Sequence, residues 1–236
     1  MKNCIIASTS TIYGGNYLDY LLPHLSELYN QTSEIVFIPY AQPGGMSCDA
    51  YTQKAQEAFN HIGKKIVGLH SFSSPTEAIK RAKGLFTGGG NTFRLVNELY
   101  KNDLMHTLRE AILNGTPYLG TSAGSNICGL TMQTTNDMPI VYPPSFKTLG
   151  VLPFNLNPHY LDPIPNSKHM GETRETRIKE FHSINNLPVI GLREGSWIEA
   201  KENILTLKGD FNAKVFFQNK EPFEIEPITR LETIIE

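Results

Sequence analysis

Three absences narrow what this chain of 236 residues can be. It has only three cysteines, Cys4, Cys48 and Cys128, and no C-x-x-C pair, which argues against a disulfide framework and a zinc site. Its 21 Lys and Arg nearly balance its 23 Asp and Glu, without the basic cluster that nucleic acid or an anionic membrane needs. The apolar run at the N-terminus, Cys4 to Ala7, is too short for a signal peptide or a membrane span. We therefore expect a cytoplasmic protein without nucleic-acid or membrane partners.

The first 122 residues alternate between two patterns. With 40% apolar and 19% charged residues overall, the composition is that of a globular protein, and we expect a single α/β domain over residues 1–236. Short apolar runs predict buried strands at Asn3–Ser8, Glu34–Tyr40, Lys64–Phe72, Ala82–Gly90 and Thr116–Ser122. Helical spacing falls between them, at Tyr17–Leu28, Cys48–Ile62, Pro75–Ala82, Thr92–Tyr100 and Leu104–Leu113. Such alternation predicts a mainly parallel sheet with helices on both faces.

From Asn136 onward the sequence becomes rich in proline, as in "NDMPIVYPPSF" and "LPFNLNPHYLDPIPN". Loops of this length in a compact domain are usually functional. Gly171–Ile184 predicts one more helix, and "LPVIGLREG" a further buried strand. The remainder alternates apolar and polar residues around a turn at 201–203, which predicts a C-terminal antiparallel hairpin and an edge strand.

Ser122 stands between two glycines in "PYLGTSAGSNICG", at the point where a predicted strand passes into small residues that can begin a helix. Gly-x-Ser-x-Gly in this context is the pattern of a nucleophile elbow, in which glycines permit a sharp turn that exposes the serine. The helix N-terminus behind it offers N–H groups to a developing oxyanion. Glycine-rich turns also cradle phosphates or simply pack tightly, so both readings stay open at this point.

A second glycine-rich turn, "FTGGGNT", follows the preceding predicted strand. It fits neither Gly-x-Gly-x-x-Gly nor a P-loop. One interpretation is a tight turn with Asn91 as the helix N-cap. The other is a loop whose free N–H groups supply the second half of an oxyanion hole.

A serine nucleophile needs a base and a group that orients the base. Four histidines fall in predicted helices and one in the loop before "GETR"; these are His24, His61, His106, His182 and His169. His70, at a strand end, and His159, in "LNPHY", are the two remaining candidates for the base. For the third group, Glu194 and Asp137 compete, and spacing alone does not choose between them.

Five blocks, "FTGGGNTFRL", "YLGTSAGSNICGLTMQTTNDMPIV", "LNPHY", "GETRETRI" and "GLREGSWI", together resemble the peptidase E family, the cytoplasmic α-aspartyl dipeptidases. The resemblance implies a sheet like that of class I glutamine amidotransferases, and hydrolysis of dipeptides with an N-terminal aspartate without metal or cofactor. It also implies that Ser122 is the nucleophile, His159 the general base and Glu194 the third member. The chain order Ser, His, Glu differs from that of α/β-hydrolases, so the shared motif looks convergent.

The mechanism that the resemblance implies is acyl transfer through Ser122, with backbone N–H groups near Gly89 and of Ala123 as the oxyanion hole. The same resemblance points to Arg174 as the partner of the substrate's aspartyl side chain. Arg177 is the alternative, a surface ion-pair partner. Asp137 and Asn136 are candidates for the substrate's free α-amino group.

Two residues depart from the family pattern: Thr121 stands where Trp is frequent, and Arg193 where Pro is frequent. Thr121 is expected to reshape one wall of the pocket, and Arg193 to draw Glu194 away from the histidine if its side chain turns that way. Two rival functions are a peptidase of isoaspartyl bonds, similar to cyanophycinase, and a binding module without catalysis. We expect small dipeptides as the only ligands, and a monomer or a homodimer.

Overall fold

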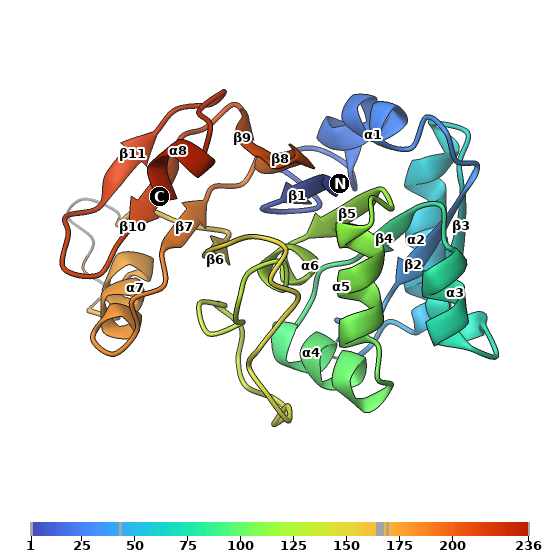
Figure 1. Cartoon of the computed structure of the whole chain (residues 1–236), viewed down its shortest axis with the longest axis horizontal. Helices are drawn as coiled ribbons and strands as arrows, with labels where there is room; N and C mark the ends of the chain where they lie inside the picture. Colours follow the sequence, from blue (N-terminus) through green and yellow to red (C-terminus); the bar gives the residue numbers. More distant parts are fainter. Residues whose placement is uncertain (1, 43, 164–167, 169, 236) are drawn as a thin grey trace.

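The computed structural model describes residues 2–42, 44–163, 168 and 170–235. His169 lies outside the described residues. The main sheet of the protein has the strand order β3-β2-β4-β5-β1-β8-β9 (Figure 1). The parallel strands are β1 (Lys2–Ala7), β2 (Glu34–Ile38), β3 (Lys65–Gly68), β4 (Leu85–Thr87) and β5 (Tyr118–Thr121). The hairpin of β8 (Ser196–Glu202) and β9 (Ile204–Gly209) adds antiparallel strands beyond β1.

Helices cover both faces of this sheet, as the alternation in β1 shows. Cys4 and Ile6 point into one apolar cluster, Ile5 and Ala7 into the other, because successive strand residues face opposite sides. The second cluster contains α1 (Leu22–Leu28) and α2 (Cys48–Asn60). The first contains α3 (Pro75–Arg81), α4 (Thr92–Lys101) and α5 (Met105–Leu113). Two short 3-10 helices, η1 (Asp19–Leu21) and η2 (Leu69–Ser71), and the single-turn α6 (Ala123–Asn126) complete this part. The predicted α/β class is confirmed.

The C-terminal part corrects one expectation. The sequence predicts a C-terminal antiparallel hairpin and an edge strand; the hairpin β8–β9 extends the main sheet, while four other strands form a second sheet in the order β11-β10-β7-β6. These are β6 (Asn155–Pro158), β7 (Val189–Leu192), β10 (Ala213–Phe216) and β11 (Phe223–Ile225). With α7 (Arg174–His182) and α8 (Glu232–Ile235) they occupy the left of Figure 1. The segment expected as one edge strand is therefore a second hairpin.

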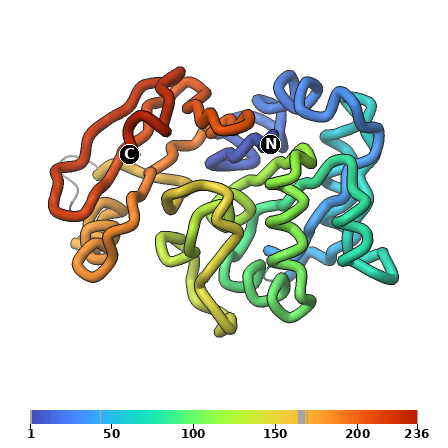
Figure 2. Tube along the Cα trace, viewed as in Figure 1, coloured from blue at the N-terminus to red at the C-terminus, as the bar shows by residue number. Residues whose placement is uncertain are grey.

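The connection from α6 to β6 is a long irregular excursion, which the tube in Figure 2 shows in yellow-green beside α4. The hydroxyl of Tyr100 donates to the carbonyl of Lys147 at 2.9 Å, and the rings of Phe93 and Phe146 lie 6.2 Å apart. These contacts fasten the excursion to α4.

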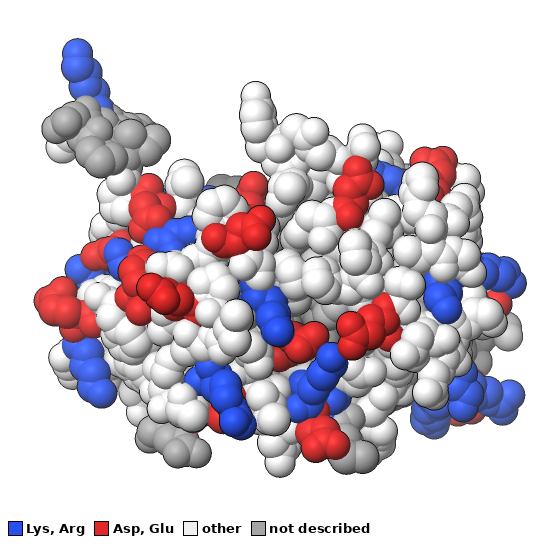
Figure 3. Space-filling view, turned by 90° about the horizontal axis from the view of Figure 1, so that it is seen from above, with Lys and Arg blue, Asp and Glu red and all other residues white. Residues whose placement is uncertain are grey.

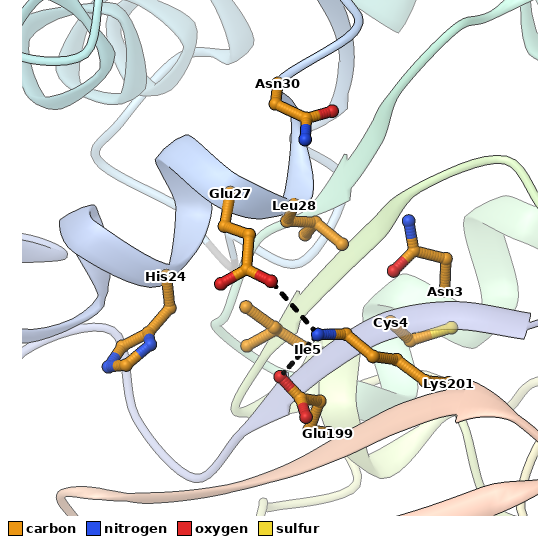
Figure 4. A pocket seen from close by; sticks show the side chains of 9 residues that line it. All are labelled: Asn3, Cys4, Ile5, His24, Glu27, Leu28, Asn30, Glu199 and Lys201. Carbon is orange, nitrogen blue, oxygen red and sulfur yellow. Dashed lines mark hydrogen bonds and ion pairs between the residues drawn. The ribbon is translucent and has the colours of Figure 1, made fainter.

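Charges of both signs are interspersed on the face shown in Figure 3, in keeping with the near balance of acidic and basic residues. Over the described ranges, no helix combines the length and the apolar character that crossing a membrane requires. A cavity of about 170 Å³ lies between α1, β1 and β8 (Figure 4), where Lys201 Nζ contacts Glu27 at 3.2 Å and Glu199 at 3.4 Å. Asn3 lines this cavity at the start of β1. Ser122 follows the end of β5, which runs parallel to β1, so the cavity and Ser122 lie at opposite ends of these strands.

Candidate active site

Ser122 occupies the sharp turn between β5 and α6. Its backbone has φ 53° and ψ −110°, an unusual conformation for a residue with a side chain, and such strain is typical of functional sites. A Cβ at position 120 would lie 2.6 Å from the carbonyl oxygen of Gly124, and one at position 124 would lie 2.2 Å from that of Thr87. Both flanking residues must therefore be glycine for the turn to close around the serine.

His159 and Glu194 reach Ser122 from the second sheet. Strands β6 and β7 are parallel with Pro158 opposite Leu192, so the residues after them leave the same end of the sheet. His159 Nε2 lies 2.8 Å from Ser122 Oγ, and His159 Nδ1 lies 2.6 Å from Glu194 Oε1. The carboxylate can only accept, so Nδ1–H donates to it and Nε2 is left to accept the serine proton. This is the arrangement of a nucleophile, a base and an orienting acid.

Ser8, the first residue after β1, holds the backbone of His159 through a hydrogen bond. Its hydroxyl is fully buried, donates to the carbonyl of Leu192 at 2.6 Å and accepts the N–H of His159 at 2.8 Å. His159 has φ 54°, again in the left-handed region that side chains disfavour. The residue that follows a strand of the main sheet thus holds the backbone of the histidine that follows a strand of the second sheet.

The geometry chooses between the two histidine candidates. His70 lies on η2 rather than on a strand, because β3 ends at Gly68. Its Nε2 pairs with Asp49 Oδ1 at 2.7 Å, away from the serine. His159 is the histidine that the structure brings to Ser122.

Backbone N–H groups flank the serine as an oxyanion hole requires. A Cβ at position 89 would lie only 3.0 Å from Ser122 Cβ, which places the Gly89 backbone directly beside Ser122. Ala123 is the first residue of α6, so its N–H has no partner within the helix. Neither N–H has an acceptor among the residues that the structure describes. Both therefore remain able to donate to an oxyanion.

Hydrogen bonds thus join Ser122, His159 and Glu194 in one chain, and the sequence around them is similar to that of known proteins. The model of peptidase family S51 matches residues 4–208. The chain belongs to peptidase family S51. It is 42% identical over 223 residues to peptidase E of Streptomyces coelicolor, and the aligned region covers 94% of this chain and 90% of that protein. It is 39% identical over 238 residues to a probable alpha-aspartyl dipeptidase of Drosophila melanogaster, covering 100% of this chain and 98% of that protein. The resemblance to peptidase E is thus confirmed.

Solved structures agree with this S51 assignment at the level of the fold. A putative peptidase E from Listeria monocytogenes superimposes with a TM-score of 0.67 at 21% identity, covering 89% of this chain and 100% of that one. A peptidase from an acI-B1 actinobacterium gives a TM-score of 0.72 at 14% identity, covering 98% and 96%. The fold is therefore shared with solved peptidases.

Asp137 and Asn136 line the same small cleft as Ser122 and His159 in this S51 chain. Asp137 Oδ2 accepts three hydrogen bonds: from the N–H of Thr92 at 2.7 Å, its hydroxyl at 2.6 Å and the Thr135 hydroxyl at 3.0 Å. Asp137 therefore stabilises the first turn of α4 and does not orient the histidine. Of the two competing acids, Glu194 is the one that contacts His159.

The amide of Asn136 is engaged on both sides. Its Nδ2 donates to the carbonyl of Pro158 at 2.7 Å, and its Oδ1 accepts from Asn157 Nδ2 at 2.8 Å. These bonds join the loop to the end of β6, directly before His159.

Arg174 is the first residue of α7 and is half-buried. Burial lowers its pKa, as does the neighbouring Arg177, while the negative charge of Asp137 opposes them. Within the described ranges its guanidinium has no ion-pair or hydrogen-bond partner. Arg177 instead lies 3.8 Å from the Glu172 carboxylate at the surface. Arg174 is thus a cation that is available to a ligand, and Arg177 has the surface role named as the alternative.

The Arg193 side chain turns away from Glu194. It makes two hydrogen bonds of 2.8 Å to Glu224, one of 2.8 Å to Asp162 and one of 2.7 Å to the carbonyl of Asn212. The expectation that it would draw Glu194 from the histidine does not apply. These bonds tie the segments that follow β6 and β7 to the C-terminal hairpin.

Thr121 is fully buried, and its hydroxyl has no partner in the described structure. It does not form an exposed wall of the pocket, contrary to the expectation.

No three His, Cys, Asp or Glu side chains gather as metal ligands anywhere in the described ranges. Sequence reasoning missed Ser8, whose only signal is that it is the polar residue ending the apolar run "CIIAS".

Proposed function

We propose that this protein is a serine-type dipeptidase that hydrolyses dipeptides with an N-terminal aspartate. The observation that carries the proposal is the continuous hydrogen-bond chain from Glu194 through His159 to Ser122 at the strained turn. Relatives named peptidase E and probable alpha-aspartyl dipeptidase, which match nearly the whole chain, support the substrate class.

The residues fit acyl transfer in two steps. His159 Nε2 takes the proton of Ser122 as Oγ attacks the carbonyl carbon of the aspartyl residue, and Glu194 stabilises the imidazolium that forms. The tetrahedral oxyanion is held by N–H groups at Gly89 and Ala123. The C–N bond then breaks, His159 protonates the leaving amine, and water hydrolyses the acyl-enzyme by the same route.

Substrate choice rests on charge. We propose that Arg174 pairs with the aspartyl side chain, since a guanidinium can grip a carboxylate through two bonds. For the substrate's ammonium group, Asp137 is the better of the two candidates, because all three of its hydrogen bonds go to Oδ2 and leave Oδ1 to accept. Asn136 is the weaker candidate, since both ends of its amide are engaged.

A dipeptide panel tests the substrate class. Asp-Leu, Glu-Leu, Asn-Leu and β-Asp-Leu are incubated with the protein in the presence of EDTA, and free leucine is measured. The proposal predicts cleavage of Asp-Leu alone. Cleavage of β-Asp-Leu would favour an isoaspartyl peptidase instead. If folded protein releases leucine from none of the dipeptides, a binding module would be favoured.

Arg174→Met tests the charge argument, with Arg177→Met as its matched control on the next turn of α7. A hydrogen-bonded charge pair contributes about 1.5–3 kcal/mol, so kcat/KM for Asp-Leu falls about 10- to 100-fold in the first variant and little in the second. Equal losses in both would remove Arg174 from the substrate site.

We also propose that the protein acts in the cytoplasm, as a monomer or a homodimer. The free state of all three cysteines supports a reducing compartment. Cell fractionation and sedimentation velocity test these two statements.

A further inference from the structure

The loop of residues 88–91, which passes beside the nucleophile, is held by side chains as well as by backbone. The N–H of Gly88 donates to the carbonyl of Ile38 at 3.3 Å, and the N–H of Asn91 to that of Ala41 at 2.7 Å. The peptide between Gly89 and Gly90 has no backbone partner in the described part of the chain. Its orientation therefore depends on other contacts.

Two side chains supply those contacts. The carbonyl oxygen of Gly89 accepts a hydrogen bond from the Tyr51 hydroxyl at 3.1 Å and another from Gln42 Nε2 at 3.0 Å. In a trans peptide the carbonyl and the following N–H point in opposite directions. Fixing the Gly89 carbonyl toward Tyr51 and Gln42 therefore also fixes the direction of the Gly90 N–H.

Tyr51 is built into this position. Its side chain is buried, and its ring meets Phe37 edge-on, with the centroids 4.9 Å apart and the planes at 84°. A Cβ at position 88 would lie 2.5 Å from the tyrosine oxygen, so this approach requires glycine there. Burial raises the pKa of the Tyr51 hydroxyl, so it stays protonated and remains a donor.

We propose that Tyr51 and Gln42 are positioning residues of the oxyanion hole: by holding the Gly89 carbonyl they keep Gly89, whose own N–H is one of the two oxyanion donors, in place beside Ser122. The proposal rests on the proposed serine mechanism and adds to it two residues outside the triad. Their effect is on the transition state, because the oxyanion exists only there, so they support kcat rather than substrate binding.

Tyr51→Phe is the test, and Tyr29→Phe is its matched control. The Tyr29 hydroxyl is also buried and donates to a strand carbonyl, that of Leu85, at 2.6 Å. Both variants lose one buried hydrogen bond and a few degrees of Tm. We expect kcat for Asp-Leu to fall about tenfold in Tyr51→Phe with KM within about twofold, and kcat to be unchanged in Tyr29→Phe. Gln42→Met removes the second donor and gives a loss of the same kind.

A fluorophosphonate gives a readout that needs no dipeptide. Ser122 Oγ forms a bond to phosphorus, the P–F bond breaks, the serine proton passes to His159 and fluoride leaves; the phosphonyl oxygen then occupies the oxyanion hole. The labelling rate constant should fall in Tyr51→Phe by the same ratio as kcat, and stay unchanged in Tyr29→Phe.

The two readouts separate the possible failures. Wild type that labels but cleaves no dipeptide refutes the proposed substrate, while slower labelling in Tyr51→Phe alone still supports the positioning role. Equal behaviour of the two tyrosine variants in kcat and labelling overturns the inference. So does a rise in KM alone, or folded wild type that does not label.

Discussion

Replacing Ser8 by alanine removes the hydroxyl that holds His159 and leaves the side chains of Ser122, His159 and Glu194 unchanged. Two hydrogen bonds disappear, one donated to the carbonyl of Leu192 and one accepted from the N–H of His159. The Leu192 carbonyl keeps a second donor, the N–H of Tyr160 at 3.1 Å. The His159 N–H is left without an acceptor.

The magnitude follows from this imbalance. A buried donor without a partner costs about 1–3 kcal/mol, and the part-buried position of this one argues for the lower half of that range, about 1–2 kcal/mol. For a chain of 236 residues this lowers Tm by roughly 3–6 °C. His159 also loses part of what holds it at φ 54°, and as its imidazole shifts from Ser122 we expect kcat to fall about tenfold.

Calorimetry and Asp-Leu hydrolysis measure the two effects, with Ser196→Ala as the control. Ser196 is equally buried, and its hydroxyl donates to the carbonyl of Phe211 at 2.8 Å without contacting His159. The control should lose stability and keep kcat. If kcat is unchanged in Ser8→Ala, as is expected for Ser196→Ala, the claim that Ser8 positions His159 is wrong.

Three further predictions concern stability and reactivity. Arg193→Ala breaks the ion pairs that tie the loop of the triad carboxylate to the C-terminal hairpin, so urea unfolding should show a loss of about 1–3 kcal/mol; an unchanged midpoint would contradict this. Cys48 should be the one thiol that a disulfide reagent titrates in the native protein, against three in denaturant, because the other two are buried and burial raises their pKa; two fast native thiols would refute it. Hydrogen bonds from Lys179 and then Lys214 lower the pKa of Glu175, so its contribution to stability is present above the pKa of the unfolded chain and is lost as pH falls through the lower folded value. Glu175→Gln should therefore reduce the loss of stability on acidification, and superimposable curves of unfolding free energy against pH would argue otherwise.

The main sheet could be predicted because each of its strands carries its own signal. Fully apolar runs mark strands covered on both faces, and the glycines around Ser122 mark a turn where backbones touch. The boundaries were less accurate: the run from Lys64 to Phe72 ends as a strand at Gly68, because the next residues, Leu69–Ser71, form the 3-10 helix that carries His70.

The second sheet could not be predicted from local pattern. Its strand β6 has only four residues, and its neighbour β7 lies about thirty positions later in the chain. The choice between Asp137 and Glu194 was hidden for a similar reason: both are loop acids, and only folding shows that the hydroxyls of Thr92 and Thr135 turn to the first. Tyr51 lies on a helix and has no sequence mark of its contact with Gly89.

The central claim is that Ser122 is the nucleophile of an aspartyl dipeptidase. The measurement that tests it most directly is peptide mapping of the protein after fluorophosphonate treatment, with and without an excess of Asp-Leu or Asn-Leu. The account predicts a single adduct on Ser122 that Asp-Leu slows and Asn-Leu does not. An adduct on another residue, or folded protein that remains unmodified, would contradict it.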